Sequence, residues 1–155
     1  MRFAALPVLI ALTMPLSAAA AADMIDATNA ARIAQKLTDL GYRAKMDTDG
    51  AGDPMIRSAA SGANFSVFFY GCTDGADCTA VQFQAGFDLA DASTAAKMNE
   101  WNKTHRFGTA YIDDEGDPML QMDVTLDGGV SEANFADVVD WWEIVLGEFQ
   151  DYIGW

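Results

Sequence analysis

The sequence has few of the residues on which enzyme active sites are built. It contains one histidine, His105, and no Gly-x-Ser-x-Gly sequence of the kind that marks a hydrolase nucleophile. A Ser-His-Asp triad would have to use His105, which lies in a polar stretch beside Arg106 and is more simply interpreted as a surface residue. A glycine-rich phosphate-binding loop is also missing. We therefore expect no enzymatic activity, no catalytic residues and no cofactor.

Positive charge is scarce. The chain has 9 lysine and arginine residues against 23 aspartate and glutamate residues, which gives a net charge of −14. Such a surface repels nucleic acid and anionic membranes, so we expect neither as a partner. The excess of acid fits a cationic partner or, more simply, solubility.

Long hydrophobic runs are confined to the N-terminus. An apolar run from Phe3 to Leu16 follows a basic start, and residues 17–22 are all small. The run is shorter than the roughly 20 residues that a membrane span requires. This pattern predicts a secretory signal peptide over residues 1–22, cleaved after Ala22 or after Ala20, with a retained anchor as the alternative. We expect a single exported domain over residues 23–155, periplasmic or secreted, with no membrane insertion after cleavage.

The only two cysteines, Cys72 and Cys78, stand at the two ends of a short polar loop. Their spacing does not fit a Cys-x-x-Cys redox motif, and His105 is too far along the chain to suggest a shared metal site. In an exported protein the pair predicts a disulfide, with free thiols as the alternative. Closing so short a loop would stabilise the fold by about 2 kcal/mol.

Two strands are predicted on either side of that loop, because apolar residues alternate with others in both runs. One parity is apolar throughout and predicts a buried face; its members are Phe65, Val67, Phe69, Val81, Phe83, Ala85 and Phe87. The other parity is mixed and includes Phe68 and Tyr70. We predict that Phe68 and Tyr70 form an exposed aromatic patch that binds a partner, or that lies between two copies in a homodimer.

The remaining elements complete an antiparallel sheet covered on one face by helices. The last helix is the clearest prediction: Ser131 caps it, and a stripe that includes Trp142 and Phe149 has helical spacing. The fold class is therefore α+β, in the order α-β-β-β-β-α-β-β-α. Besides the central hairpin and the last helix, the predicted elements are helices over about 27–40 and 93–105 and strands over 42–48, 55–60, 107–113 and 119–126. Asp91 or Ser93 is the expected cap of the second helix.

Two acidic turns offer the main candidates for cation binding. The turn from Asp47 to Asp53 resembles a calcium loop, but Ala51 and Ser58 stand where an EF-hand needs ligands, so we predict no metal site. The Gly-Asp-Pro-Met string of the first turn, at 52–55, recurs 64 residues later at 116–119. Either the same type of turn occurs twice in one antiparallel sheet, or a helix–strand–turn–strand unit is duplicated.

Trp101 and Asn102 form a further candidate for partner contact. Tryptophan is over-represented at the energetic centres of interfaces, which favours a contact surface at this pair. Packing of Trp101 in the core is the alternative interpretation.

Several short strings, taken in order, resemble those of a known family. They include Leu40-Gly41-Tyr42, the Phe-Phe-Tyr-Gly-Cys run at 68–72, Asn99-Glu100-Trp101-Asn102, and Gly128-Gly129-Val130-Ser131. Together they resemble the YbjN-domain proteins, bacterial sensory transduction regulators. The resemblance covers nearly all of residues 23–155. It implies a fold like that of the class I type III secretion chaperones and supplies no catalytic residues. The signal peptide and the cysteine pair set this chain apart from cytoplasmic members.

These observations lead to one main expectation and two alternatives. We expect a non-enzymatic periplasmic module that binds or regulates a protein partner. The first alternative is a small-molecule or divalent-cation binding protein that uses the acidic turns, and the second is a hydrolase that depends on His105.

Overall fold

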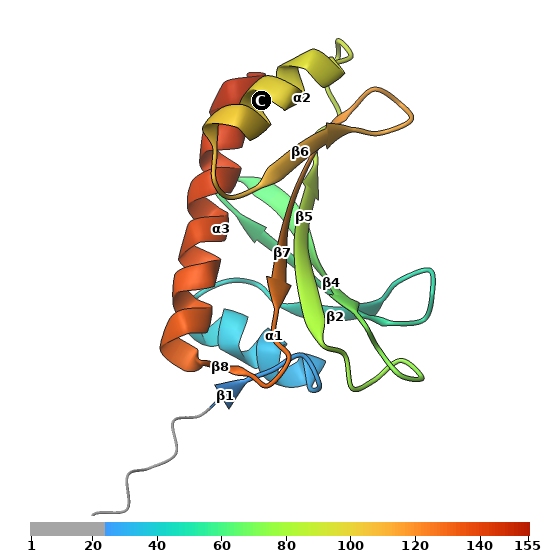
Figure 1. The fold of residues 1–155 in the computed structure, drawn as a ribbon, viewed down its shortest axis with the longest axis vertical. Coiled ribbons are helices and arrows are strands. Elements are labelled where there is room, and N and C mark those ends of the chain that lie inside the picture. Colours follow the sequence, from blue (N-terminus) through green and yellow to red (C-terminus); the bar gives the residue numbers. More distant parts are fainter. Residues whose placement is uncertain (1–23) are drawn as a thin grey trace, which may run out of the picture.

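The computed structural model describes residues 24–155, and the predicted signal peptide lies outside the described residues. The chain forms three helices and eight strands within that range (Figure 1). In order they are β1 (Met24–Ile25), α1 (Ala30–Asp39), β2 (Lys45–Thr48), β3 (Pro54–Ala60), β4 (Ala63–Tyr70), β5 (Ala80–Gly86), α2 (Ala95–Thr104), β6 (Thr109–Ile112), β7 (Pro118–Thr125), β8 (Val130–Ser131) and α3 (Glu132–Ile153).

Six of the strands form one antiparallel sheet in the order β2-β3-β4-β5-β7-β6. The predicted α+β class and the predicted order of elements are confirmed, with one addition. The short strands β1 and β8 pair with each other outside the main sheet, through Met24 with Ser131 and Ile25 with Val130. They were not predicted, because two residues are too few to show an alternating pattern.

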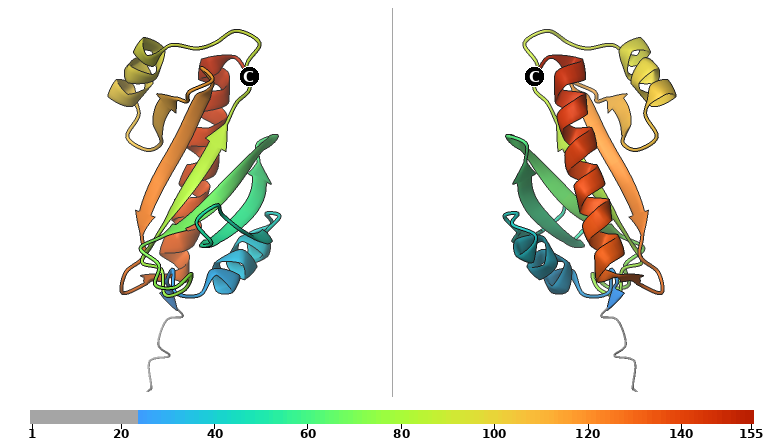
Figure 2. Two further views of the ribbon diagram at one scale, coloured as in Figure 1. Left: turned by 90° about the vertical axis from the view of Figure 1, so that its right-hand side faces the viewer. Right: turned by 90° about the vertical axis from the view of Figure 1, so that its left-hand side faces the viewer.

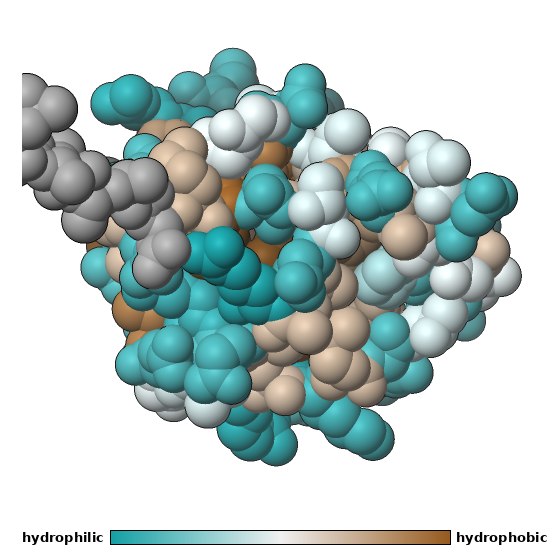
Figure 3. Space-filling model, turned by 90° about the horizontal axis from the view of Figure 1, so that it is seen from below, coloured by the Kyte–Doolittle hydropathy of each residue, from teal (hydrophilic) through white to brown (hydrophobic). Residues whose placement is uncertain are grey.

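The helices cover one face of the sheet. In Figure 1, α3 runs along the sheet with α1 near its lower end and α2 near its upper end. The strands cross in front of α3 in the left view of Figure 2, and α3 lies in front of them in the right view. Trp142 of α3 lies between Phe65 and Phe83, with ring centroids 5.6 Å from each. All seven residues predicted for the apolar face are buried, which confirms that face. Seen from below, hydrophilic residues alternate with residues of intermediate hydropathy and a few hydrophobic ones (Figure 3).

The helix ends follow from their capping residues. The Asn29 side chain accepts a hydrogen bond from the Arg32 N–H at the start of α1, and Gly41, with φ of 96°, lets the chain turn out of the helix at its end. Ser131 caps α3 as predicted. The predicted cap of α2 was wrong: Thr94, not Asp91 or Ser93, accepts from the Lys97 N–H. No helix within residues 24–155 is both long and apolar enough to cross a membrane.

Candidate functional site

The face of the sheet opposite the helices carries the polar side chains of the strands. Cross-strand pairing places Arg57, Ser66, Gln84, Gln121 and Thr109 in one row across this face. Because neighbouring residues of a strand point to opposite faces, the row lies on the side away from Phe65 and Phe83. We call this side the polar face.

A broad hollow of about 970 Å³ lies beside the start of β2, and it reaches from Arg57, Ser66 and Phe68 on the polar face to Tyr42 and Phe65 on the helix side. Its lining includes three cationic residues, Arg43, Lys45 and Arg57, together with Phe68. These are three of only 9 lysine and arginine residues in the chain. The local charge at the hollow is therefore opposite in sign to the net charge of the molecule.

Two of the three cations have partners within the chain. The Arg57 Nε atom donates a hydrogen bond to Asp47, and this bond, with those from neighbouring groups, holds the pKa of Asp47 below its usual range. The Arg43 Nη2 atom donates to Asn64 Oδ1 at 3.2 Å. Asp47 offsets only one of the three positive charges, so the rim of the hollow stays cationic.

A chain of hydrogen bonds crosses the polar face beside the hollow. The Tyr70 hydroxyl donates to Gln82 Oε1 at 3.5 Å, and Gln82 Nε2 donates to Asp123 Oδ1 at 2.8 Å. Burial, followed by the negative charges of Asp123 and Asp49, raises the pKa of Tyr70 above its ordinary value. The Tyr70 hydroxyl is therefore protonated at neutral pH and available as a donor.

Two of the four predicted contact residues lie on the polar face. Phe68 and Tyr70 are two residues apart on β4 and share this face; Phe68 is half-buried and Tyr70 is 46 % exposed. Phe68 also lines the hollow and so lies beside the cationic rim, whereas Tyr70 is not part of the lining.

The other two predicted contact residues lie elsewhere. Trp101 is fully buried, and its Nε1 atom donates to the Gly108 carbonyl at 2.8 Å. The Asn102 side chain exchanges two hydrogen bonds with the backbone of Ala110, at 2.9 and 2.8 Å. Both side chains attach α2 to β6, which agrees with the packing interpretation of Trp101.

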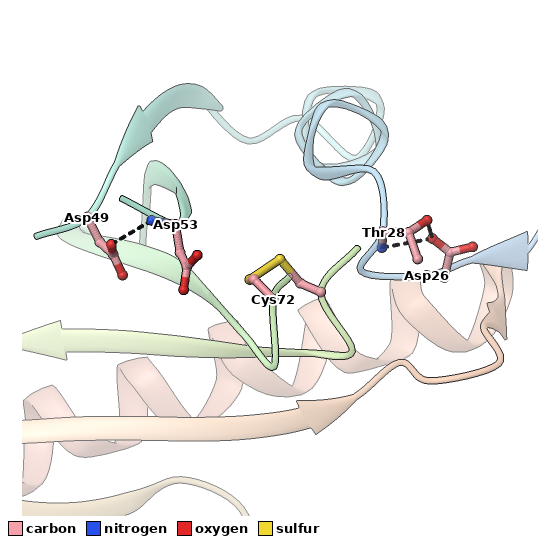
Figure 4. The surroundings of a disulfide bond; sticks show 6 residues. Asp26, Thr28, Asp49, Asp53 and Cys72 are labelled. Carbon is pink, nitrogen blue, oxygen red and sulfur yellow. Dashed lines mark hydrogen bonds between the residues drawn. A yellow bond between two sulfur atoms is a disulfide. The ribbon is translucent and has the colours of Figure 1, made fainter. Parts of the chain in front are cut away.

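The two cysteines lie at bonding distance in the connection between β4 and β5. The sulfur atoms of Cys72 and Cys78 are 2.10 Å apart, and Cys78 is buried. Figure 4 shows this disulfide near the turn that carries Asp49 and Asp53.

The two acidic turns use their aspartates to hold their own backbones. Asp49 Oδ1 accepts hydrogen bonds from the N–H groups of Ala51 and Asp53, at 2.8 and 2.9 Å. Asp113 does the same in the second turn. In the described part of the chain, no group of three or more histidine, cysteine or acidic residues is placed to hold a metal ion.

The cationic rim was missed at the level of the sequence. Counting outward from the predicted turn at 49–54 pairs Lys45 with Ser58, whereas the structure begins β3 at Pro54 and pairs Lys45 with Arg57. This shift of one residue, which places both cations in one row, has no signal in the sequence. Arg43 precedes β2, and its position depends on how the chain leaves α1.

Comparison with known proteins gives one match. A family model, YbjN, described as "Putative bacterial sensory transduction regulator", matches residues 29–155. No curated protein and no solved structure matches the chain.

Proposed function

The chain belongs to the YbjN family of putative bacterial sensory transduction regulators, and we propose that it is a non-enzymatic regulatory module that binds a protein partner in the periplasm. The partner contacts the polar face of the sheet at the hollow. The observation that carries this proposal is the gathering of Arg43, Lys45 and Arg57 beside Phe68 in a chain of net charge −14.

The charge of the hollow suggests which side chains the partner segment carries. At physiological ionic strength, charges further apart than about 8 Å are largely screened, so a docking segment responds to the local rim more than to the distant acidic surface. Arginine and lysine bind carboxylates, and Phe68 offers apolar contact. We therefore propose an acidic partner segment that also carries an apolar or aromatic side chain. The net charge alone had suggested a cationic partner.

Two features support a periplasmic location. The sequence of residues 1–22 has the pattern of a signal peptide. The Cys72–Cys78 disulfide would persist in an oxidising compartment and would be rare in the cytosol.

Small-molecule binding is the second candidate function. The volume of the hollow, about 970 Å³, is within the range of small-molecule sites. The three cations on its rim favour a ligand with a carboxylate or phosphate group. They do not favour a divalent cation, which the acidic turns had suggested.

The protein-binding proposal is tested by affinity capture with the exported protein from periplasmic extract. The test variant is Phe68→Ala/Tyr70→Ala, and Trp155→Ala is the control because Trp155 is an exposed aromatic residue outside the hollow. We expect proteins captured by the wild type and the control to be lost with the test variant. Identical capture and identical self-association in all three proteins would contradict the proposal.

The location is tested by cell fractionation and by a non-reducing peptide map of the full-length chain. We expect the protein in the periplasmic fraction, with Cys72 and Cys78 in one crosslinked peptide. Recovery in the cytosol with both thiols open to alkylation would contradict export.

A further inference from the structure

The outer edge of β7 is only partly paired. β6 pairs with Pro118–Gln121, so the last four residues of β7, from Met122 to Thr125, extend beyond it. The Leu126 N–H donates to the Thr79 carbonyl, on the side of β5. Successive residues of a strand direct their backbone N–H and C=O groups to opposite sides, so those of Asp123 and Thr125 point outward, away from β5. Within residues 24–155, no strand pairs with these outward groups.

An apolar groove lies beside this free edge, between β7 and α3. It has a volume of about 200 Å³, and its apolar lining is Phe107, Met122, Val124, Val138 and Trp141. Trp141 is 41 % exposed and packs against Phe107, with ring centroids 4.9 Å apart. Ile144, one turn further along α3, is also exposed. Adjacent exposed apolar side chains of this kind mark contact surfaces.

The polar residues at the groove are acidic. Asp123 and Asp137 are part of its lining, and Asp140 is exposed on the next turn of α3. No lysine or arginine is part of the lining, and the cation nearest in sequence, Arg106, lies over the Phe107 ring at 5.6 Å. The groove therefore favours a cationic occupant.

We propose that the free edge of β7 and this groove bind an extended, basic segment of a partner protein as an added strand in line with β6. Every second side chain of the segment is apolar and lies in the groove against Trp141 and Val138. The side chains between them are lysine or arginine and lie beside Asp123. The backbone of the segment pairs with the outward groups of Asp123 and Thr125.

A second copy of this chain is the less suitable occupant. Pairing two β7 edges would bring Asp123 and Asp137 of both copies together, in molecules that each carry a net charge of −14. Like charges placed opposite each other on paired strands are destabilising. The site differs from the hollow in position and in charge, so this inference does not rest on the proposed function of the polar face.

The test uses the exported protein and a synthetic heptapeptide of alternating lysine and valine, with binding measured by calorimetry. We expect the peptide to bind the wild type, and Trp141→Ala and Asp137→Lys each to weaken binding by about tenfold or more. Asp137 is exposed, so Asp137→Lys is expected to fold even if Trp141→Ala does not. The variant Phe68→Ala, which changes only the hollow, should bind as the wild type does.

Two further peptides separate strand addition from simple charge attraction. A glutamate–valine heptapeptide should not bind, and N-methylation of alternate amides of the lysine–valine peptide should weaken binding by about tenfold or more because it blocks strand pairing. The proposal is overturned if the lysine–valine peptide does not bind, if N-methylation has no effect, or if both groove variants bind with unchanged affinity. Failure of this test leaves the capture experiment at the polar face unaffected.

Discussion

Tyr42 connects the segment that follows α1 to the middle of α3. Its hydroxyl donates a hydrogen bond to Glu143 Oε2. Burial, this bond, and the charges of Glu143 and Asp140 together raise the pKa of Tyr42 well above its ordinary value near 10. The folded protein thus holds this phenol in its neutral form over a wider pH range than the unfolded chain does.

Tyr42→Phe should change both the stability and its dependence on pH. At pH 8 the loss of the hydrogen bond should lower the free energy of unfolding by about 1–2 kcal/mol. Above about pH 10 the unfolded tyrosine ionises first, so the wild type loses stability as pH rises toward the folded pKa, and the variant lacks that loss. Urea unfolding at pH 8 and pH 11 should show the gap between the two proteins narrowing. A gap that is equal at both pH values would show that the Tyr42 pKa is not raised by folding.

At the scale of elements, α3 shows how far periodicity predicts structure. The sequence placed Trp142 on the apolar stripe, and the structure leaves Trp142 fully buried while its neighbour Trp141 is 41 % exposed. A helix of 22 residues carries enough turns for the stripe to be unambiguous. The short helix α2 lies after Asp91, Ser93 and Thr94, each able to cap, and the choice among them depends on the loop before it.

Two strands begin later than their sequence suggests, because contacts with α3 hold the residues before them. Tyr42 and Phe107 have high strand propensity, but β2 starts at Lys45 and β6 at Thr109. Tyr42 is held by the end of α1 and by Glu143, and Phe107 packs against Trp141. Glu143 and Trp141 are distant in the sequence from Tyr42 and Phe107, and local propensity does not include such contacts.

The candidate sites, like the strands, were predictable only where a local signal existed. Alternation along β4 is a local signal, and it placed Phe68 and Tyr70 on one face. The buried position of Trp101 depends on Gly108, and the groove beside β7 depends on β6 beginning only at Thr109. Neither is visible until the chain is folded.

Trp142 provides a test of how α3 is held on the sheet. It packs against Phe65 and Phe83, and its indole Nε1 has no hydrogen-bond partner within the described residues. Trp142→Ala should lower the free energy of unfolding by about 3–5 kcal/mol. Trp142→Phe should cost much less, about 1–2 kcal/mol, because it also removes an unpaired buried N–H. Urea unfolding of both variants measures this, and equal losses would contradict the expected order.

At the scale of the whole molecule, one unit occurs twice. The unit α1-β2-β3 is repeated as α2-β6-β7, with β2 and β6 starting 64 residues apart and forming the two edges of the sheet. The strands β4 and β5 lie between the two copies. The sequence left open whether only a turn was repeated, because only the Gly-Asp-Pro-Met string matches. The structure extends the repeat to the whole helix–strand–turn–strand unit.

The two proposed sites occupy related positions in the two units. With the offset of 64, Arg43 at the hollow corresponds to Phe107 at the groove, and Ser58 corresponds to Met122. The hollow in the first unit has cationic residues in its lining, and the groove in the second unit has apolar and acidic residues in its lining. The two repeated units thus carry sites of opposite charge, which suits two different partner segments.

The repeated turn gives a test in which the two units are compared directly. Asp49 and Asp113 bond to their turns in the same pattern, and Gly52 and Gly116 have φ of 94° and 93°. An alanine in this left-handed conformation costs about 1–2 kcal/mol at either position. A Cβ atom at Gly52 would meet no atom within 4 Å, whereas one at Gly116 would lie 3.0 Å from Ala92 Cβ.

We therefore expect Gly116→Ala to destabilise the protein more than Gly52→Ala, in urea unfolding at pH 7. The loop at Ala92 is anchored by the Ser93 N–H, which donates to the Gly116 carbonyl at 3.1 Å, so it does not move away freely. Adding Ala92→Gly to Gly116→Ala, with Ala92→Gly alone as the reference, should reduce the loss to that of Gly52→Ala. Equal losses for the two single variants would mean that the second turn is not packed against the loop before α2. The two units would then share their backbone geometry and also the surroundings of their turns.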